Sequence, residues 1–295
     1  MKLTSRSRKS LSGFLFILPW LIGFLLFFVV PFGKNIFYSL NHIKFSQEGL
    51  KFTWVGFNNF RFAFFEDPNM VQTLTEVIIQ LFYEVPVILV LSIFMAILLK
   101  SSFFGRRMAR AIFFLPVIVG TGIVIQIFRT DPNAAELQQV ISETSYIFQS
   151  TGIEDLLYGS GVSEEIVSYF TTAINEVFSL TWKSGIQILI FLAGLNSIPG
   201  VLYEVARVEG ATSWETFWKI TFPLLSPIIL LNIVYSIIDS FMSFDNMMIR
   251  MIRKISVDDL NYGYGAAVSI IYFITVFVII MFVIRVISKR VYYMS

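Results

Sequence analysis

Apolar runs long enough to cross a membrane recur along this chain, and they constrain its fold more than any other feature. A helix needs about 20 apolar residues to cross the hydrocarbon core. Six runs of about that length or more lie at about 13–32, 71–99, 111–128, 177–198, 224–244 and 265–287. Only 14% of the residues are charged, whereas about a quarter are charged in an average soluble protein. Because a backbone in lipid must satisfy its own hydrogen bonds, we predict an all-α, polytopic membrane protein. Its six transmembrane helices are expected to form one membrane domain over residues 1–295.

The basic amino terminus, followed by an apolar run, is also typical of a secretory signal peptide. Lys2, Arg6, Arg8 and Lys9 precede the first run. That run is longer than the roughly 7–15 apolar residues of a signal peptide, and no small-residue cleavage site follows it. We therefore expect the first run to be retained as a transmembrane helix.

Lys and Arg residues are distributed unevenly between the two sides that six spans define. Thirteen lie on the side of both termini and of the loop at 199–223, eight lie on the other side, and Lys183 falls within a span. Cytoplasmic loops carry the excess of positive charge, so both termini and the 199–223 loop are predicted to be cytoplasmic. The polar and aromatic loop at 33–70 and the acidic insert at 129–176 are then extracytoplasmic. A net charge of only +2 gives no reason to expect nucleic acid as a partner.

The loop at 199–223 has the sequence signals of two short helices joined by a tight turn. Pro199 suits the first turn of a helix, and Gly210 stands where a left-handed residue would end that helix. Thr212 and Glu215 have the spacing of a capping box, which opens a second helix. Pro223 is expected to end the second helix because proline cannot donate to the helical ladder. Two interpretations stay open: an ordinary loop between spans, or a surface that a soluble partner holds.

The same loop resembles the EAA loop shared by permease subunits of binding-protein-dependent ABC importers. The matching residues are Glu204, Ala206, Gly210, Ile220 and Pro223, which fall between the fourth and fifth of six spans, as in that family. The segments at 16–20, 55–60, 191–199 and 262–267 resemble the carbohydrate (maltose-type) branch, in particular the first of its two permeases. The chain departs from the family pattern at Val205, and it lacks the family's Gly-Gly-Pro stretch after the fifth span.

This resemblance implies the role of the chain and the subunits around it. A pair of permeases would form the pathway, two cytoplasmic ATPases would grip the EAA loops, and an extracytoplasmic solute-binding protein would deliver a sugar or oligosaccharide. The membrane would be the cytoplasmic membrane of a prokaryote. The five matching residues would be the ATPase-coupling positions. The chain has no Gly-x-x-x-x-Gly-Lys-Ser/Thr motif, so ATP and Mg would be bound by the partner ATPase. The chain itself is expected to be a non-catalytic permease subunit without a cofactor.

Polar residues within the apolar runs are candidates for lining a transport pathway, because an unpaired polar group in lipid is costly. Asn232, Tyr235 and Asp239 on the fifth span are the candidate substrate contacts. Other polar residues within or at the ends of spans are Glu84, Gln126, Lys183, Gln187 and Asp245. Their alternative role is hydrogen bonding between helices or, for Lys183 and Asp245, reaching the membrane surface.

Two other classes of protein compete with an importer subunit. A stand-alone channel or an ion-coupled transporter for another small solute would show denser intramembrane charge, or paired broken helices in two halves. An integral membrane enzyme would need reactive side chains clustered at one depth. The chain has a single histidine, His42, beside no obvious carboxylate, and it has no cysteine. We therefore expect no catalytic residue and no metal site.

Overall fold

The computed structural model describes residues 5–46, 49–101, 104–111, 113, 163, 166–169, 171–172, 180, 183–243 and 246–291. The predicted third span at 111–128 and the insert at 129–176 lie almost entirely outside the described residues, as do Gln126 and Asp245. By contacts the chain divides into two compact units. One comprises residues 1–81 and 239–281, and the other comprises residues 82–238 and 282–295. The expectation of one membrane domain therefore stays a prediction.

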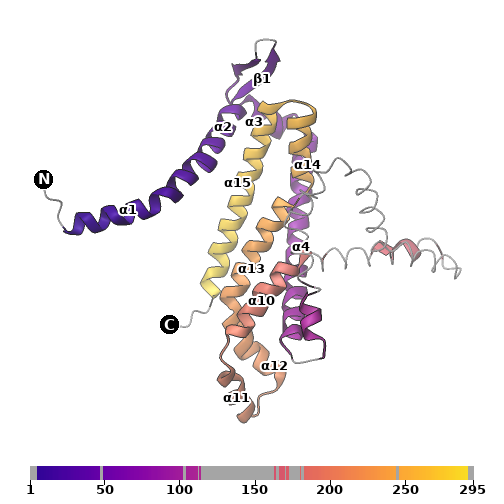
Figure 1. Ribbon diagram of the computed structural model, residues 1–295. Helices are drawn as coiled ribbons and strands as arrows, with labels where there is room; N and C mark the ends of the chain where they lie inside the picture. Colours follow the sequence, from indigo (N-terminus) through magenta and orange to yellow (C-terminus); the bar gives the residue numbers. More distant parts are fainter. Residues whose placement is uncertain are drawn as a thin grey trace. The chain divides into compact units, whose positions relative to one another are not determined.

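The described residues are mostly helical, as predicted (Figure 1). The first unit contains α1 (Ser5–Phe24), the π-turn η1 (Leu25–Val29), α2 (Val30–Ser39), β1 (Asn41–Ser46), β2 (Gly49–Trp54), α3 (Asn58–Phe65), α14 (Met247–Arg253) and the π-turn η3 (Lys254–Asp258). The second contains α10 (Gly185–Ser197), α11 (Gly200–Val208), α12 (Ser213–Thr216), the π-turn η2 (Phe217–Thr221) and the 3₁₀ turn η4 (Ser288–Arg290). Three long helices contribute to both units: α4 (Pro68–Lys100), α13 (Phe222–Met242) and α15 (Tyr262–Ile287).

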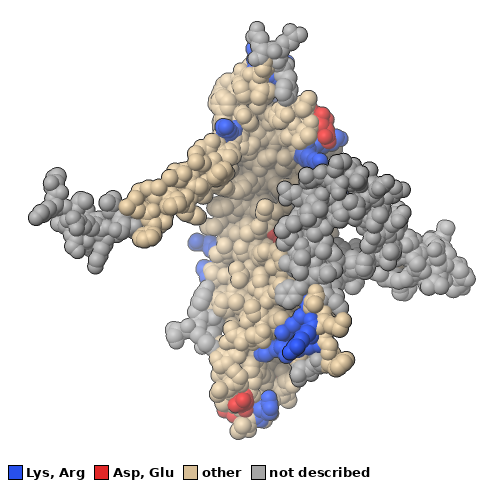
Figure 2. All heavy atoms as spheres, viewed as in Figure 1, with Lys and Arg blue, Asp and Glu red and all other residues tan. Residues whose placement is uncertain are grey.

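Several helices have the length and composition to cross a membrane. Within the described part of the chain four qualify, at Phe14–Ser39, Pro68–Lys100, Ser213–Asp258 and Tyr262–Arg290. α10 and α11 together would make a fifth, although they are bent by 65° relative to each other. Figure 2 shows that uncharged residues cover most of the described surface in view, which suits contact with lipid. The first helix continues to Ser39, beyond the expected end of its apolar run near residue 32.

The all-α prediction missed a two-stranded antiparallel sheet in the loop at 33–70. β1 pairs with β2 from Asn41 opposite Trp54 to Ser46 opposite Gly49. Polar and apolar residues alternate in both strands, and this pattern of period two is typical of a strand with one covered face. Gly49 has a φ of +117°, which favours glycine at the start of the returning strand.

The prediction that the second helix of the 199–223 loop ends before Pro223 is wrong. α12 runs through η2 into α13 without a break. In η2 the N–H of Phe222 donates to the carbonyl of Phe217, five residues back instead of four. This wider turn ends two residues before Pro223, whose missing N–H and bulky ring disturb an ordinary helical ladder. Pro31 has the same arrangement, because η1 ends two residues before it.

Aromatic rings one helical turn apart stack along the first helix. The ring centroids of Trp20, Phe24, Phe28 and Phe32 are 5.4, 5.1 and 5.9 Å apart in sequence order. Residues four apart lie on one face of a helix, so the four rings form a ladder on one side. The ladder ends against Phe273 of α15, whose ring centroid lies 5.4 Å from that of Phe32. The contact between Phe32 and Phe273 packs α2 against α15 within the first unit.

A buried apolar core joins α4, α10 and α13 in the second unit. Its buried members are Ala96, Leu99, Ile188, Phe191, Leu192, Leu195, Ile198 and Leu225. Gly194 of α10 faces α13 so closely that an added Cβ would lie 2.8 Å from Cγ1 of Ile228. The absence of a side chain at Gly194 therefore permits the close packing of these two helices.

Candidate coupling site and intramembrane polar cluster

Gly210 ends α11 in the way that the sequence predicts. Its φ is +77°, a left-handed conformation that glycine adopts readily. The N–H of Gly210 donates to the carbonyl oxygen of Arg207 at 3.2 Å, and the N–H of Ala211 donates to that of Ala206 at 2.9 Å. These two bonds define a Schellman motif, which satisfies the last carbonyl groups of a helix. The turn therefore requires a residue at 210 that tolerates a positive φ.

The predicted capping box is present at the start of α12. The Thr212 hydroxyl accepts a hydrogen bond from the N–H of Glu215 at 3.3 Å, and the Glu215 carboxylate accepts one from the N–H of Thr212 at 3.0 Å. Lys219 lies 3.4 Å from the same carboxylate. The Thr212 backbone, then its hydroxyl, then Lys219 lower the pKa of the Glu215 carboxyl. Because the folded-state pKa is the lower one, this contribution to the helix is present above the unfolded pKa and is lost as the pH falls through the folded pKa.

Replacing Thr212 by alanine removes the hydroxyl that caps α12. We expect the start of that helix to lose about 1 kcal/mol of stability, because the N–H of Glu215 is left without its acceptor. Hydrogen exchange should therefore quicken at the amides of residues 214–216. Thr75→Ala is the matched control: the Thr75 hydroxyl bonds to the carbonyl of Val71 inside α4, where alanine is the better helix former. Unchanged exchange at residues 214–216 would contradict the role of the cap.

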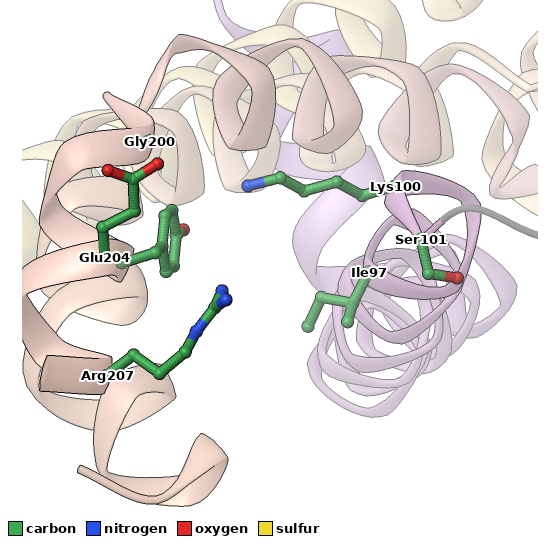
Figure 3. A pocket seen from close by; sticks show the side chains of 7 residues that line it. Ile97, Lys100, Ser101, Gly200, Glu204 and Arg207 are labelled. Carbon is green, nitrogen blue, oxygen red and sulfur yellow. The ribbon is translucent and has the colours of Figure 1, made fainter. Parts of the chain in front are cut away.

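An open hollow of about 520 Å³ lies between the end of α4 and α11 (Figure 3). It is lined by Ile97, Lys100 and Ser101 from the first segment and by Gly200, Tyr203, Glu204 and Arg207 from the second. Figure 3 shows the side chains of Lys100 and Arg207 extending into the hollow from opposite sides. Two cations and one carboxylate thus surround an opening with an aromatic ring and an aliphatic side chain in its wall.

Lys100 connects the end of α4 to both α10 and α11. Its Nζ donates to the carbonyl oxygen of Leu195 at 3.0 Å and lies 4.5 Å from the ring centroid of Tyr203. The Tyr203 hydroxyl in turn lies 3.2 Å from Oγ1 of Thr221 in η2. Sequence reasoning did not identify Lys100 and Tyr203 as site residues. The available signal was the basic turn at 100–110, which the charge count places on the same side of the membrane as the 199–223 loop.

The five predicted coupling positions differ in exposure. Glu204 and Gly210 are exposed, Ala206 is buried, and Ile220 and Pro223 are half-buried, the first in η2 and the second near the start of α13. Of the five, only Glu204 lines the hollow. The structure thus brings Glu204 together with Lys100 and Arg207, and it places Gly210 in the exposed turn between the two helices. The coupling role of all five positions stays a prediction.

A second group of polar residues lies inside the second unit, between α4, the segment leading into α10, and α13. Oε1 of Glu84 lies 2.7 Å from Nζ of Lys183, and their side chains are 6% and 31% exposed. Gln187 is fully buried, and its Nε2 donates to Oγ of Ser236 at 3.3 Å. Nδ2 of Asn232 donates to the backbone carbonyl of Gln187 at 3.2 Å. Glu84 and Lys183, separate candidates in the sequence, are therefore an ion pair.

The three predicted pathway residues on α13 also differ in exposure. Asn232 is fully buried, Tyr235 is half-buried and Asp239 is exposed. Within the described part of the chain, Oδ1 of Asn232 and Oε1 of Gln187 are buried without a hydrogen-bond donor. A buried acceptor left without a donor is costly. The polar cluster can therefore accept hydrogen bonds from a hydroxyl-bearing molecule if the helices open to admit one.

Curated proteins similar to this chain include several permeases. The probable ABC transporter permease protein YesP of Bacillus subtilis (strain 168) is 34% identical over 249 residues, which cover 83% of this chain and 75% of YesP. The sn-glycerol-3-phosphate transport system permease protein UgpA of Escherichia coli O157:H7 is 27% identical and covers 95% of each chain. The arabinooligosaccharides transport system permease protein AraP of Bacillus subtilis is 26% identical over 92% of this chain and 87% of AraP. No model of a protein family matches the chain.

The fold also resembles that of a solved transporter. The crystal structure is of a bacterial alginate ABC transporter in complex with an alginate pentasaccharide-bound periplasmic protein. One of its chains matches with a TM-score of 0.66 and 19% identity over 96% of each chain. Apolar helices of spanning length with a polar cluster between them define a multi-pass membrane protein. The identity to YesP over most of both chains is more specific: this chain belongs to the ABC transporter permeases.

Proposed function

We propose that this chain is one of two permease subunits of an ATP-driven importer, and that it passes a sugar or oligosaccharide across the cytoplasmic membrane by alternating access. In this proposal the chain crosses the membrane six times and has both termini in the cytoplasm. It includes two ATPase subunits and an extracytoplasmic solute-binding protein as partners. Membership of the permease family supports the class, and the names of AraP and of the alginate transporter support a carbohydrate as cargo.

The observation that carries the proposal is the geometry of the 199–223 loop. Two short helices are fixed at their junction by a Schellman motif and a capping box, and an open charged hollow lies beside the first. α11 exposes Val205 and Val208, 48% and 89% accessible, and buries Ala206. A short helix with exposed apolar side chains suits a groove on a partner. We assign this loop as the EAA coupling loop and the ATPase as that partner.

The contacts of Lys100 and Tyr203 give a route for movement from the ATPase into the membrane. Lys100 joins α4 to α10 and α11, and Tyr203 joins α11 to η2, which continues directly into α13. A displacement of α11 would therefore move the ends of α4 and α13 as one body. The polar cluster lies further along these helices, and its two acceptors that lack a donor within the described part of the chain suit the hydroxyl groups of a sugar. Asn232, Tyr235 and Asp239 remain the proposed pathway residues.

Reconstitution tests this proposal. Proteoliposomes holding both permeases and the ATPases, with the solute-binding protein outside, should take up a radiolabelled oligosaccharide only when ATP is enclosed. Each component is omitted in turn, and uptake should cease every time. Uptake driven by an ion gradient through this chain alone would contradict the proposal and favour the alternative, a stand-alone or ion-coupled transporter or channel.

A further inference from the structure

The hollow between the end of α4 and α11 carries charges of both signs. Lys100 and Arg207 extend into it from opposite sides (Figure 3), and Glu204 is the one acid among the described residues that line it. In the same view the carboxylate of Glu204 points toward the start of α11 at Gly200. A volume of about 520 Å³ falls within the roughly 300–1,000 Å³ of small-molecule sites. The lining therefore suits a ligand that carries an anionic group with a cationic group beside it.

Lys100 is held in position before any ligand arrives. The contacts of its Nζ with the Leu195 carbonyl and the Tyr203 ring fix it on one wall of the hollow. An ammonium group has three N–H donors, so the bond to Leu195 leaves donors for an anion. On the other wall, the exposed Arg207 offers a planar fork that matches the oxygens of a phosphate group. A phosphate between these two side chains would meet donors from both walls.

The hollow lies where two apolar helices end. The candidate span that contains α4 ends at Lys100, and the 65° bend between α10 and α11 follows directly after Ser197. Ile97, one turn back along α4, forms an apolar wall of the hollow. Lipid phosphates lie in the headgroup layer, just outside the hydrocarbon that such spans cross. A lipid headgroup can therefore reach Lys100 while its acyl chains run past Ile97 along the apolar part of α4.

α11 turns one face to the hollow and a different face to solvent. The residues that line the hollow from α11 have the spacing of one helix face: Gly200, Tyr203, Glu204 and Arg207. Exposed valines have the spacing of a second face: Val201, Val205 and Val208. A groove on the ATPase that holds the valine face leaves the hollow open toward α4. A small headgroup and the ATPase can therefore occupy α11 together.

We propose that this hollow binds the phosphoethanolamine headgroup of a membrane lipid. Lys100 and Arg207 hold the phosphate from two sides, and the carboxylate of Glu204 accepts hydrogen bonds from the ammonium group. A headgroup with a phosphate but no amine would satisfy the two cations, yet it would bring its negative charge near Glu204 without a cation between them. The inference goes beyond the proposed function, because it requires only that α4 spans the membrane.

Arg207→Gln tests the phosphate contact. The Arg207 side chain is exposed, and its backbone carbonyl still accepts the bond from Gly210, so α11 should keep its fold. We expect the mole fraction of phosphatidylethanolamine at half-maximal binding to rise about tenfold, because a charge-assisted hydrogen bond is lost. Arg207→Lys keeps the charge and should bind better than Arg207→Gln. Arg290→Gln is the matched control, since it removes an exposed arginine of the same unit on η4.

Glu204→Gln tests the amine contact. This substitution removes the negative charge that the ammonium group meets in the hollow. Binding of phosphatidylethanolamine should weaken, whereas binding of phosphatidylglycerol, whose headgroup has no amine, should not. The unaltered protein should prefer phosphatidylethanolamine, and the variant should lose that preference.

The experiment uses the full-length chain, with the subunits that copurify with it, in nanodiscs of phosphatidylcholine, whose quaternary amine has no N–H to donate. Phosphatidylethanolamine or phosphatidylglycerol with the same photoactivatable acyl chain is added in increasing amounts, and labelled peptides are quantified by mass spectrometry. Labelling by phosphatidylethanolamine should concentrate on residues 97–101 and 200–207, with the shifts given above for each variant.

Equal labelling of these residues in Arg207→Gln and in the unaltered protein overturns the proposal, as does an equal loss in Arg290→Gln. Labelling by phosphatidylglycerol as strong as that by phosphatidylethanolamine also overturns it. Phosphoethanolamine in solution, at millimolar concentration and constant ionic strength, should not displace the lipid, and complete displacement would assign the site to a soluble ligand instead. The labelling does not depend on transport, so failure of ATP-driven uptake counts against the proposed function alone.

Discussion

Gly210→Pro abolishes ATP-driven uptake while the protein still inserts into the membrane. Proline fixes φ near −65° and has no N–H, whereas Gly210 has a φ of +77° and donates to Arg207. The substitution removes both the conformation and the bond, and the turn loses roughly 2–4 kcal/mol. α11 and α12 then no longer meet at the angle that the Schellman motif sets. We expect uptake in proteoliposomes to fall to background while ATP hydrolysis continues without stimulation by the binding protein.

A graded series at the same position separates loss of the turn from loss of the protein. Asparagine tolerates the left-handed conformation better than other side chains, so Gly210→Asn should keep most of the uptake. Alanine costs roughly 1–2 kcal/mol in that conformation, so Gly210→Ala should fall between Asn and Pro. Gly33→Ala is the matched control, because Gly33 lies in α2 with open space around it. Normal uptake by Gly210→Pro, at an equal amount of protein in the membrane, would contradict the account.

Removing either partner of the Glu84–Lys183 pair destabilises the protein, whereas replacing both partners together leaves its stability almost unchanged. Glu84→Gln removes the carboxylate that pairs with the Lys183 charge, and Lys183→Met removes the cation that pairs with the nearly buried carboxylate of Glu84. Each single substitution should cost roughly 3–5 kcal/mol, whereas replacing a buried pair together is often close to neutral. Thermal unfolding in nanodiscs gives the stability of the unaltered protein, of the two single variants and of the double variant.

The exposed pair of Glu215 and Lys219 provides the matched control. These side chains are 43% and 74% exposed and 3.4 Å apart, so solvent screens them. The cycle of Glu215→Gln and Lys219→Met should show little or no coupling. The capping role of Glu215 is lost in both the single Glu215 variant and the double variant, so it cancels in the coupling energy. A coupling between Glu84 and Lys183 no larger than that of this surface pair would contradict the buried ion pair.

The parts of the fold that the sequence predicts well depend on local chemistry. Apolar runs predict helices because lipid offers no other partner for the backbone, and four such helices are present in the described part of the chain. Gly210 and the Thr212–Glu215 box predict the turn because the left-handed residue and the capping bonds each involve residues close in sequence. These features need no knowledge of the tertiary fold.

The parts that the sequence did not predict depend on contacts between distant residues or on a competing backbone solution. Glu84 and Lys183 are 99 residues apart, and Lys100 and Leu195 are 95 apart, so neither contact has a local signal. The prediction that the helix ends before Pro223 assumed hydrogen bonds between residues four apart. The structure has the wider, five-residue turn η2 there, and the helix continues through the proline. The β1–β2 hairpin is different, because it has a local signal, the alternation of polar and apolar residues at Asn41–Ser46 and Gly49–Trp54, which the all-α prediction overlooked.

Cross-linking from α11 tests the central claim most directly. The chain contains no cysteine, so Val208→Cys introduces its only thiol at a side chain that is 89% exposed on α11. In membranes holding the assembled transporter, a short reagent with one thiol-reactive end and one photoactivatable end should join this residue to the ATPase subunit on illumination, with a yield that changes when ATP is added. Lys254→Cys should give no such product. A Val208→Cys variant that imports normally but is labelled only from outside the cell, and never joins the ATPase, would contradict the assignment of residues 199–223 as the coupling loop.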